Sequence, residues 1–434
     1  MKKRIMAILM VTALVMCMFA ACSSQSSGKT ATDTSAATTA ASAAETTKAA
    51  DGTTSASSGS TDTIKIGLAC PLTGTSASYG ELMVDGAKIA INEINAAGGV
   101  KGQQLELVSM DDKNDPSEAA LVAQRFCDRD DITAVISHGG STCTLAACPI
   151  YEAAKMPNMS PASNNPEITQ HGYEYYVRLG VRDDRCSPQV VAMLVNNLKL
   201  KKIGIIYANN DYGRGNLDAG VAAAKTLGAE VVAEQTYNPG LEKDFSTIIA
   251  KLQKAGCEGV AVYMDHEDAG LYFQQAHALG FDVPSVGQSS LTYKQLIDLA
   301  GVDALQNLYI CVTFNPYSDR TTVTNFMDKF LAVRPGEVPS EPCAGCYDIV
   351  QIFAKALREG ATKDNLAQWI KNTTDAKSTT FSSENVATLA ENLTWDKNGD
   401  IKPLGVSLLK VDEKGNFVNY NESVDITGLN LGLN

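Results

Sequence analysis

Hydrophobic residues recur along this chain in two alternating patterns: short apolar runs, and longer stretches in which apolar positions are three or four residues apart. The short runs are typical of buried strands, and the longer stretches are typical of amphipathic helices. An Asp-Pro-Ser-Glu sequence at 115–118 is a helix start, because Asp is a favoured N-cap and Pro a favoured first residue. In a first run we predict strands at 64–69, 105–110, 132–136 and 157–160, with helices around 83–94, from 115 and from about 142.

The alternation restarts after Arg178 and repeats the same pattern. In this second run we predict strands at 202–207, 230–235, 259–264 and 283–287, with helices at 215–227, at 244–256 and up to 280. From about 321 the pattern predicts two helices and then late strands near 404–410. Strands separated by helices of this length form right-handed βαβ units, so we expect an α/β protein of two doubly wound parallel-sheet lobes.

The first 63 residues have a different character. Residues 1–21 combine Lys2–Arg4 with a long apolar run, which predicts a signal peptide. The Ala-Ala-Cys that ends at Cys22 resembles a bacterial lipobox, so we expect a lipid on Cys22; cleavage after Ala21 without lipidation is the alternative. Residues 22–63 are then a linker of mainly Ser, Thr and Ala, which cannot bury enough apolar surface to fold. The prediction is an extracytoplasmic body tethered to the outer face of the cell membrane.

Charge and length narrow the function classes. The 434 residues allow two or three domains. The chain carries 36 Lys and Arg against 49 Asp and Glu, a net charge of −13. A nucleic-acid-binding protein would need a basic surface to neutralise phosphates, so we expect no nucleic-acid partner.

Enzymatic signatures are missing from the loops that follow the predicted strands. There is no phosphate-binding loop, no dinucleotide fingerprint and no His-Glu-x-x-His motif. His138-Gly-Gly-Ser looks like an esterase oxyanion strip, but the chain has no Gly-x-Ser-x-Gly nucleophile elbow. We therefore expect no catalysis and no cofactor.

Cysteines leave one question open. Of eleven cysteines, Cys17 leaves with the signal peptide and Cys22 takes the lipid. Cys343-x-x-Cys346 allows half a zinc site or a redox pair, and a disulfide could form somewhere among the cysteines. Plain buried thiols are the leading interpretation, and we expect no metal.

Several segments resemble one family. They are IKIGLACPLTGTSASYG at 64–80, SPASNNPEIT at 160–169, EKDFSTIIAKL at 242–252 and LTWDKNGDIKP at 393–403. They look like the periplasmic leucine/isoleucine/valine-binding proteins, the type I solute-binding family of ABC importers, over about residues 64–424. The resemblance implies two lobes joined by three crossovers near 178, 311–313 and 402–404. Lobe I would be 64–178 and 313–402, and lobe II 179–312 and 403–434.

The resemblance also implies a ligand site between the lobes. Ser141 matches a serine that holds the ligand carboxylate, and it precedes a helix whose free N–H groups favour an anion. Ala162 matches a position whose carbonyl receives the ligand ammonium. Tyr79 and Tyr212 match aromatic residues that line the cleft, with loop packing as the alternative. Asn164 stands where Thr is usual.

The site departs from the family in other places. The usual ammonium-pairing carboxylate aligns with Ser289, and the loop Gly287-Gln288-Ser289-Ser290 has no acid. We expect Asp265, one strand earlier, to supply the counter-charge; a solvated helix cap is the alternative. Gly139 and Gly140 replace bulkier residues, so we expect a wider wall there. Ser163 and Gln288 complete the predicted ligand-binding set from the same loops.

These inferences predict a monomeric lipoprotein that delivers an amino-acid-like solute to ABC permease subunits. A non-amino-acid carboxylate, such as an aromatic acid or an amide, is the second candidate ligand. A sensor ectodomain is the rival class, but the chain ends at Asn434 with no apolar run of 18 residues after the binding body.

Overall fold

The computed structural model describes residues 63–372, 393–402 and 404–431. The predicted signal peptide, Cys22 and the predicted linker up to residue 62 lie outside these ranges. Among the described helices, none is both long enough and apolar enough to cross a membrane.

The first sheet has five parallel strands in the order β2-β1-β3-β4-β5. Its strands are β1 (Ile64–Cys70), β2 (Leu105–Asp111), β3 (Ile132–Ile136), β4 (Asn158–Ser160) and β5 (Tyr176–Arg178). The helices between them are α1 (Ala77–Ala96), α2 (Pro116–Cys127), α3 (Ser141–Ala153) and α4 (Glu167–Gln170). Asp115 caps α2 as expected, because its carboxylate accepts from the N–H groups of Ser117 and Glu118.

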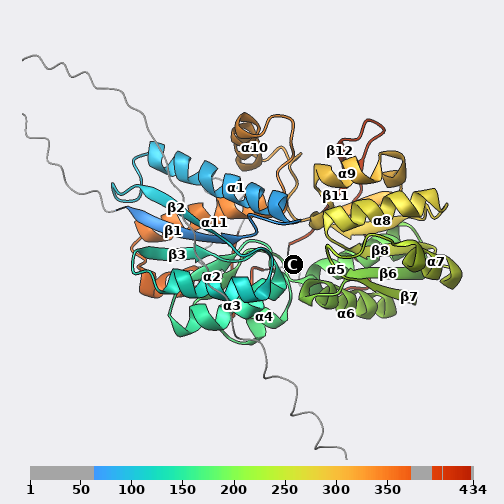
Figure 1. Cartoon of the computed structure of the whole chain (residues 1–434), viewed down its shortest axis with the longest axis horizontal. Helices are drawn as coiled ribbons and strands as arrows, with labels where there is room; N and C mark the ends of the chain where they lie inside the picture. The colour runs from blue at the N-terminus through green and yellow to red at the C-terminus, as the bar shows by residue number, and fades with distance from the viewer. Residues whose placement is uncertain (1–62, 373–392, 403, 432–434) are drawn as a thin grey trace, which may run out of the picture. The chain divides into compact units, whose positions relative to one another are not determined.

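Helices cover both faces of this sheet, which is why its strands are apolar runs (Figure 1). Ile66 and Leu68 on β1 pack with α1 and α11 (Glu341–Arg358), whereas Ala69 packs with α2 and α3. α1 and α11 meet closely at Gly86, where a Cβ atom would lie 2.0 Å from the carbonyl oxygen of Cys343. This contact brings the late helix α11 beside the first helix of the fold.

The second sheet has seven strands in the order β12-β11-β10-β9-β8-β6-β7. They are β6 (Lys202–Ala208), β7 (Glu230–Tyr237), β8 (Gly259–Tyr263), β9 (Ser285–Gln288), β10 (Leu308–Val312), β11 (Ser407–Val411) and β12 (Phe417–Tyr420). β6 to β10 are parallel, while β11 and β12 pair antiparallel at one edge. The structure is therefore the expected α/β fold with two parallel-rich sheets, and the late strands form an antiparallel ribbon.

Helices also cover both faces of the second sheet. α5 (Asp183–Ala192) and α6 (Asp211–Thr226) pack on one face, and α7 (Ser246–Ala255), α8 (His266–Ala278) and α9 (Lys294–Ala300) pack on the other. The remaining elements are α10 (Thr321–Val333), α12 (Leu366–Lys371), a π-helical turn at Met193–Asn197, and 3₁₀ turns at Ser289–Leu291, Asp303–Leu305 and Lys363–Asn365.

α6 begins four residues earlier than predicted. Asn210 is its N-cap, since its side-chain oxygen accepts from the N–H of Gly213 at 2.9 Å. The hydrophobic pattern alone missed this start because the first turn of α6 is polar. The short strand β5, the helices α4, α5 and α9, and the strands β10 and β12 were not predicted either, and the described part of the tail has three helices, α10 to α12, in place of the two predicted.

Candidate functional site

A cavity of about 500 Å³ lies between the carboxyl ends of the two sheets. This is the place where open parallel sheets bind ligands. Ten of the eleven predicted ligand-binding residues line it: Tyr79, Gly139, Gly140, Ser141, Ala162, Asn164, Tyr212, Asp265, Gln288 and Ser289. The loops after β1, β3, β4, β6, β8 and β9 thus meet around one space.

The N-terminus of α3 forms one end of the cavity. Ser141 is the first residue of this helix, and no side chain caps it. The amide groups of the first turn are therefore available to an anion. The Ser141 hydroxyl also accepts a hydrogen bond from the N–H of Asn165 at 3.2 Å, so it fixes the neighbouring loop.

The wall at Gly139 is filled rather than widened. The Tyr79 hydroxyl donates to the carbonyl oxygen of Gly139 at 3.1 Å. A Cβ atom on Gly139 would lie 2.4 Å from the Tyr79 ring, and one on Gly140 would lie 2.8 Å from the side-chain oxygen of Asn114. The expectation of a wider wall is wrong, because Tyr79 and Asn114 occupy the space that the glycines release.

Ser163 is the one predicted residue that does not line the cavity. It is fully buried, and its hydroxyl bonds Thr144 at 2.6 Å and the His138 carbonyl at 2.9 Å. His138 is also fully buried, and its Nδ1 lies 2.6 Å from Asp112. Neither Ser163 nor His138 lines the cavity.

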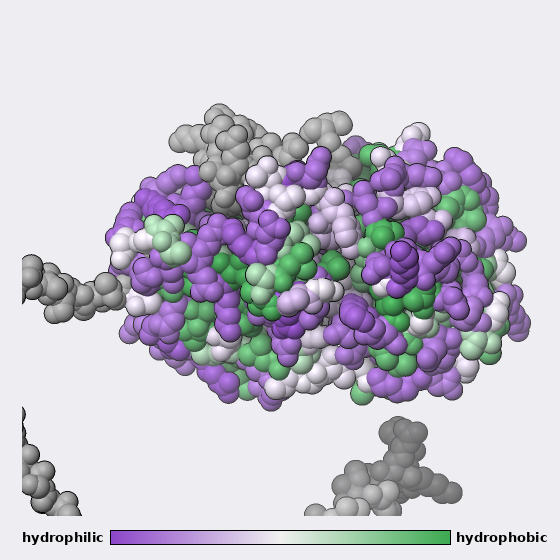
Figure 2. Space-filling view, turned by 90° about the horizontal axis from the view of Figure 1, so that it is seen from above, coloured by the Kyte–Doolittle hydropathy of each residue, from purple (hydrophilic) through white to green (hydrophobic). Residues whose placement is uncertain are grey.

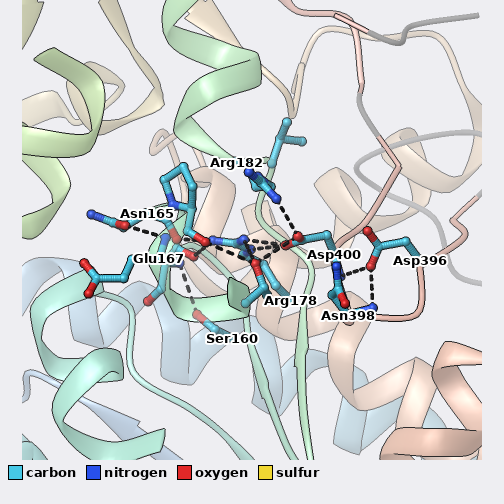
Figure 3. A network of polar contacts seen from close by, with 12 residues as sticks. Ser160, Asn165, Glu167, Arg178, Arg182, Asp396, Asn398 and Asp400 are labelled. Atoms are coloured by element: carbon cyan, nitrogen blue, oxygen red, sulfur yellow. Dashed lines mark hydrogen bonds and ion pairs between the residues drawn. The ribbon is translucent and has the colours of Figure 1, made fainter. Parts of the chain in front are cut away.

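A buried arginine holds the loop that carries Ala162 and Asn164. Arg178 donates from Nη1 to the carbonyl oxygens of Ser163 and Asn165, at 3.0 and 2.7 Å. Its charge is paired with Asp400, to which its Nε donates at 3.0 Å. Figure 3 shows the guanidinium lying between Asp400 and the loop. The backbone around Ala162 is therefore fixed by an ion pair that spans more than 200 residues of sequence.

A chain of hydrogen bonds fixes the cavity residues Tyr212 and Gln288. The Tyr212 hydroxyl donates to Gln288 at 3.2 Å, and Gln288 donates to Asn216 at 2.8 Å. Asn216 in turn donates to Asp183 at 2.9 Å. Burial raises the pKa of Tyr212 well above its usual value, so its hydroxyl stays protonated.

Asp265 lies at the N-cap position of α8, but its side chain makes no capping hydrogen bond. Asp265 lines the cavity instead. Burial raises its pKa to about 6, and the charges of Asp268 and Glu267 add to the shift. In the described residues no cation pairs with it, so it is available to a bound ligand.

Glu341 is a cavity residue that the sequence did not reveal. It is the first residue of α11, is 6% exposed, and accepts a hydrogen bond from the Ser289 hydroxyl. Burial raises its pKa, against the effect of hydrogen bonds from Ser289 and Thr313. The loop at 287–290 has no acid of its own, but the fold brings Glu341 next to Ser289. Ser340-Glu341-Pro342 reads only as a helix start, and its place in the cavity depends on α11 packing against α1.

Three rings form an aromatic wall. Tyr293 stacks on His266 with ring centroids 4.2 Å apart, and on Tyr79 at 6.2 Å. Burial lowers the pKa of His266 to about 4, so this ring is neutral at pH 7. The wall is therefore uncharged, and its ring faces suit apolar or cationic groups.

The described cysteines are nine free thiols. Cys343 and Cys346 are both fully buried in α11, and burial raises their pKa values. Within the described ranges no group of three or more His, Cys, Asp or Glu side chains is arranged to hold a metal. Cys343-x-x-Cys346 is thus part of the α1–α11 core.

Two α/β lobes with a ligand-sized cavity between their sheet edges define a bilobal solute-binding protein. The chain matches the periplasmic binding protein family over residues 63–397. It belongs to this family, in its type I branch.

Two curated relatives come from Pseudomonas aeruginosa. An amino acid binding protein is 31% identical over 359 residues, which are 82% of this chain and 91% of the relative. A leucine-, isoleucine-, valine-, threonine- and alanine-binding protein is 31% identical and covers 79% of this chain and 88% of its own.

Solved structures agree on the fold. A substrate-binding protein from Desulfitobacterium hafniense in complex with leucine is 28% identical, with a TM-score of 0.67 over 82% of this chain and 99% of its own. The branched-chain amino acid binding protein LivJ from Streptococcus pneumoniae, in complex with isoleucine, is 25% identical with a TM-score of 0.72, and covers 82% of this chain and 100% of its own.

Proposed function

We propose that this protein is an extracytoplasmic, lipid-anchored solute-binding protein that captures an amino acid and delivers it to an ABC importer. The observation that carries the proposal is a cavity lined both by an uncapped helix N-terminus, at Ser141, and by the carboxylates Asp265 and Glu341, which pair with no described cation. An amino acid zwitterion has the matching charges.

The ligand's carboxylate accepts hydrogen bonds from the first turn of α3, at Ser141. Its ammonium lies toward the Ala162 carbonyl and the acidic side of the cavity. Asp265 provides the counter-charge that a buried ammonium needs. The protein itself catalyses nothing in this scheme.

Two hydrogen bonds join the proposed lobes. Asn165 donates to the Asp211 carbonyl at 2.7 Å, and the Asp211 N–H donates to Thr142 at 3.2 Å. The lobes we propose are 64–178 with 313–402, and 179–312 with 403–434. A ligand that touches both lobes stabilises the closed form, which is the form that a permease would recognise.

Thermal denaturation with a panel of ligands tests the proposal. The panel holds the common L-amino acids, their amides, and aromatic acids. An amino acid at a hundredfold excess over its Kd should add about 2.7 kcal/mol to the unfolding free energy. Its amide, which lacks the carboxylate, should add far less. If the melting temperature rises only with acids that have no amine, the proposed amino acid function is wrong.

Fractionation tests the anchor. The wild-type protein should sediment with membranes, and a Cys22→Ser variant should be released, because the thiol carries the lipid. If the variant stays membrane-bound, Cys22 is not the anchor.

A further inference from the structure

Five acidic residues line the cavity: Asp115, Asp265, Glu267, Asp268 and Glu341. Asp115 caps α2, Asp268 lies 4.0 Å from Lys243, and Glu267 is partly exposed to solvent. The other two, Asp265 and Glu341, come from opposite lobes. Asp265 follows β8 of the seven-stranded sheet, and Glu341 begins α11, which packs with the five-stranded sheet. Neither forms an ion pair with a described Lys, Arg or His side chain. Lys113 is the only Lys or Arg among the described residues that line the cavity. Its Nζ lies 2.9 Å from the Glu118 carboxylate, so its charge is already paired.

These carboxylates are costly in the empty cavity. Glu341 is 94% shielded from solvent, and the groups that donate hydrogen bonds to it, on Ser289 and Thr313, are neutral. A carboxylate without a cation in such a place destabilises the protein unless something compensates its charge. A positively charged ligand group is the compensation that the described residues lack.

A second polar group on the same wall also lacks a partner. Tyr293 is 3% exposed and lines the cavity, yet its hydroxyl makes no hydrogen bond to a described residue. It stands in the stack with Tyr79 and His266. A cation close to this wall gains from the ring faces, and a ligand donor or acceptor can satisfy the hydroxyl.

The number of cationic groups on the ligand distinguishes neutral from basic amino acids at this site. A monoamino acid brings one ammonium, so it compensates one carboxylate and leaves the other buried and unpaired. Its own carboxylate is already used at the N-terminus of α3, near Ser141. A ligand with two cationic groups compensates both Asp265 and Glu341, and it ties the two lobes together.

We propose that the ligand is a basic amino acid, with its α-carboxylate at the start of α3 and its two cationic groups shared between Asp265 and Glu341. This inference rests on the proposed function and specifies its ligand class. The visible part of the face in Figure 2 is largely hydrophilic, with hydrophobic residues in smaller groups.

Titration calorimetry of the purified full-length protein with matched ligand pairs tests the inference. The pairs are arginine with citrulline and lysine with norleucine, which differ mainly in the side-chain cation. We expect at least one basic member to bind about 100-fold or more tightly than its neutral partner, because losing one member of a buried charge pair is that costly. If leucine or norleucine binds at least as tightly as the basic amino acids, the inference is overturned while the amino acid function stands. If no amino acid binds, both are overturned.

Two isosteric variants locate the cations. Glu341→Gln and Asp265→Asn should each weaken binding of the preferred basic amino acid by about 100-fold, with unchanged circular dichroism. Asp218→Asn, at an exposed position of α6, is the control and should bind as the wild type does. Unchanged affinity in either cavity variant overturns the assignment.

Discussion

Removing the charge of Asp265 should stabilise the empty protein. Its pKa is about 6 in the folded state, against an ordinary value of 3.8, because the folded protein desolvates the carboxylate. The folded state therefore binds more protons between these two values, and stability is lost as the pH rises through this window. Above about pH 6 the ionised carboxylate lowers the unfolding free energy by about 3 kcal/mol, which follows from the difference between the two pKa values.

The test compares wild type and Asp265→Asn by urea denaturation. The protein is first unfolded, dialysed and refolded so that no ligand remains. At pH 7.5 the variant should be more stable by about 3 kcal/mol, and at pH 4 by only about 0.5 kcal/mol, because both forms are then mostly neutral when folded. Asp218→Asn should show no such pH-dependent gain. Equal stability of wild type and Asp265→Asn at pH 7.5 would refute the argument that this carboxylate is desolvated and uncompensated.

Three further predictions concern the same site. Asp400→Asn leaves Arg178 buried without its carboxylate and should lower the unfolding free energy by about 3–5 kcal/mol in urea denaturation, whereas a loss below 1 kcal/mol would contradict a structural ion pair. Gly139→Ala pushes the Tyr79 ring into the cavity and should weaken ligand binding by about tenfold or more with a stability loss of about 1 kcal/mol, measured by calorimetry and denaturation; unchanged affinity would contradict the close contact. Affinity for a cationic ligand should be constant above about pH 6 and fall about tenfold for each pH unit below it, as Asp265 becomes protonated; a flat profile from pH 7.5 to 5 would exclude this role.

Hydrophobic runs and helix caps in the sequence predicted many elements of this fold. β1 and β6 are apolar on both faces because helices cover both sides of their sheets, and that arrangement leaves a continuous hydrophobic run in the sequence. Asp115-Pro116 starts α2 as predicted, because capping depends on neighbouring residues. The position of Ser141 and Tyr212 at the cavity follows from the rule that ligand loops lie at the carboxyl ends of strands.

Other features depend on contacts between distant segments. Ser163 lies in the same loop as Ala162 and Asn164, but Arg178 and Asp400 fix the loop backbone so that its side chain points away from the cavity. The glycines at 139 and 140 suggested extra space, and only the packing shows which side chains fill it.

The sequence by itself determined the alternation of strands and helices, the two lobes and most of the loops that face the ligand, because these follow from hydrophobic spacing and local capping. Only the tertiary structure showed that a second carboxylate, Glu341, lines the site beside the predicted Asp265. Glu341 lies 52 positions after Ser289, and the two meet because α11 packs on α1 and carries its first turn to the edge of the other lobe. A long-range contact of this kind has no local signature, since its energy comes from side chains that the chain brings together only on folding.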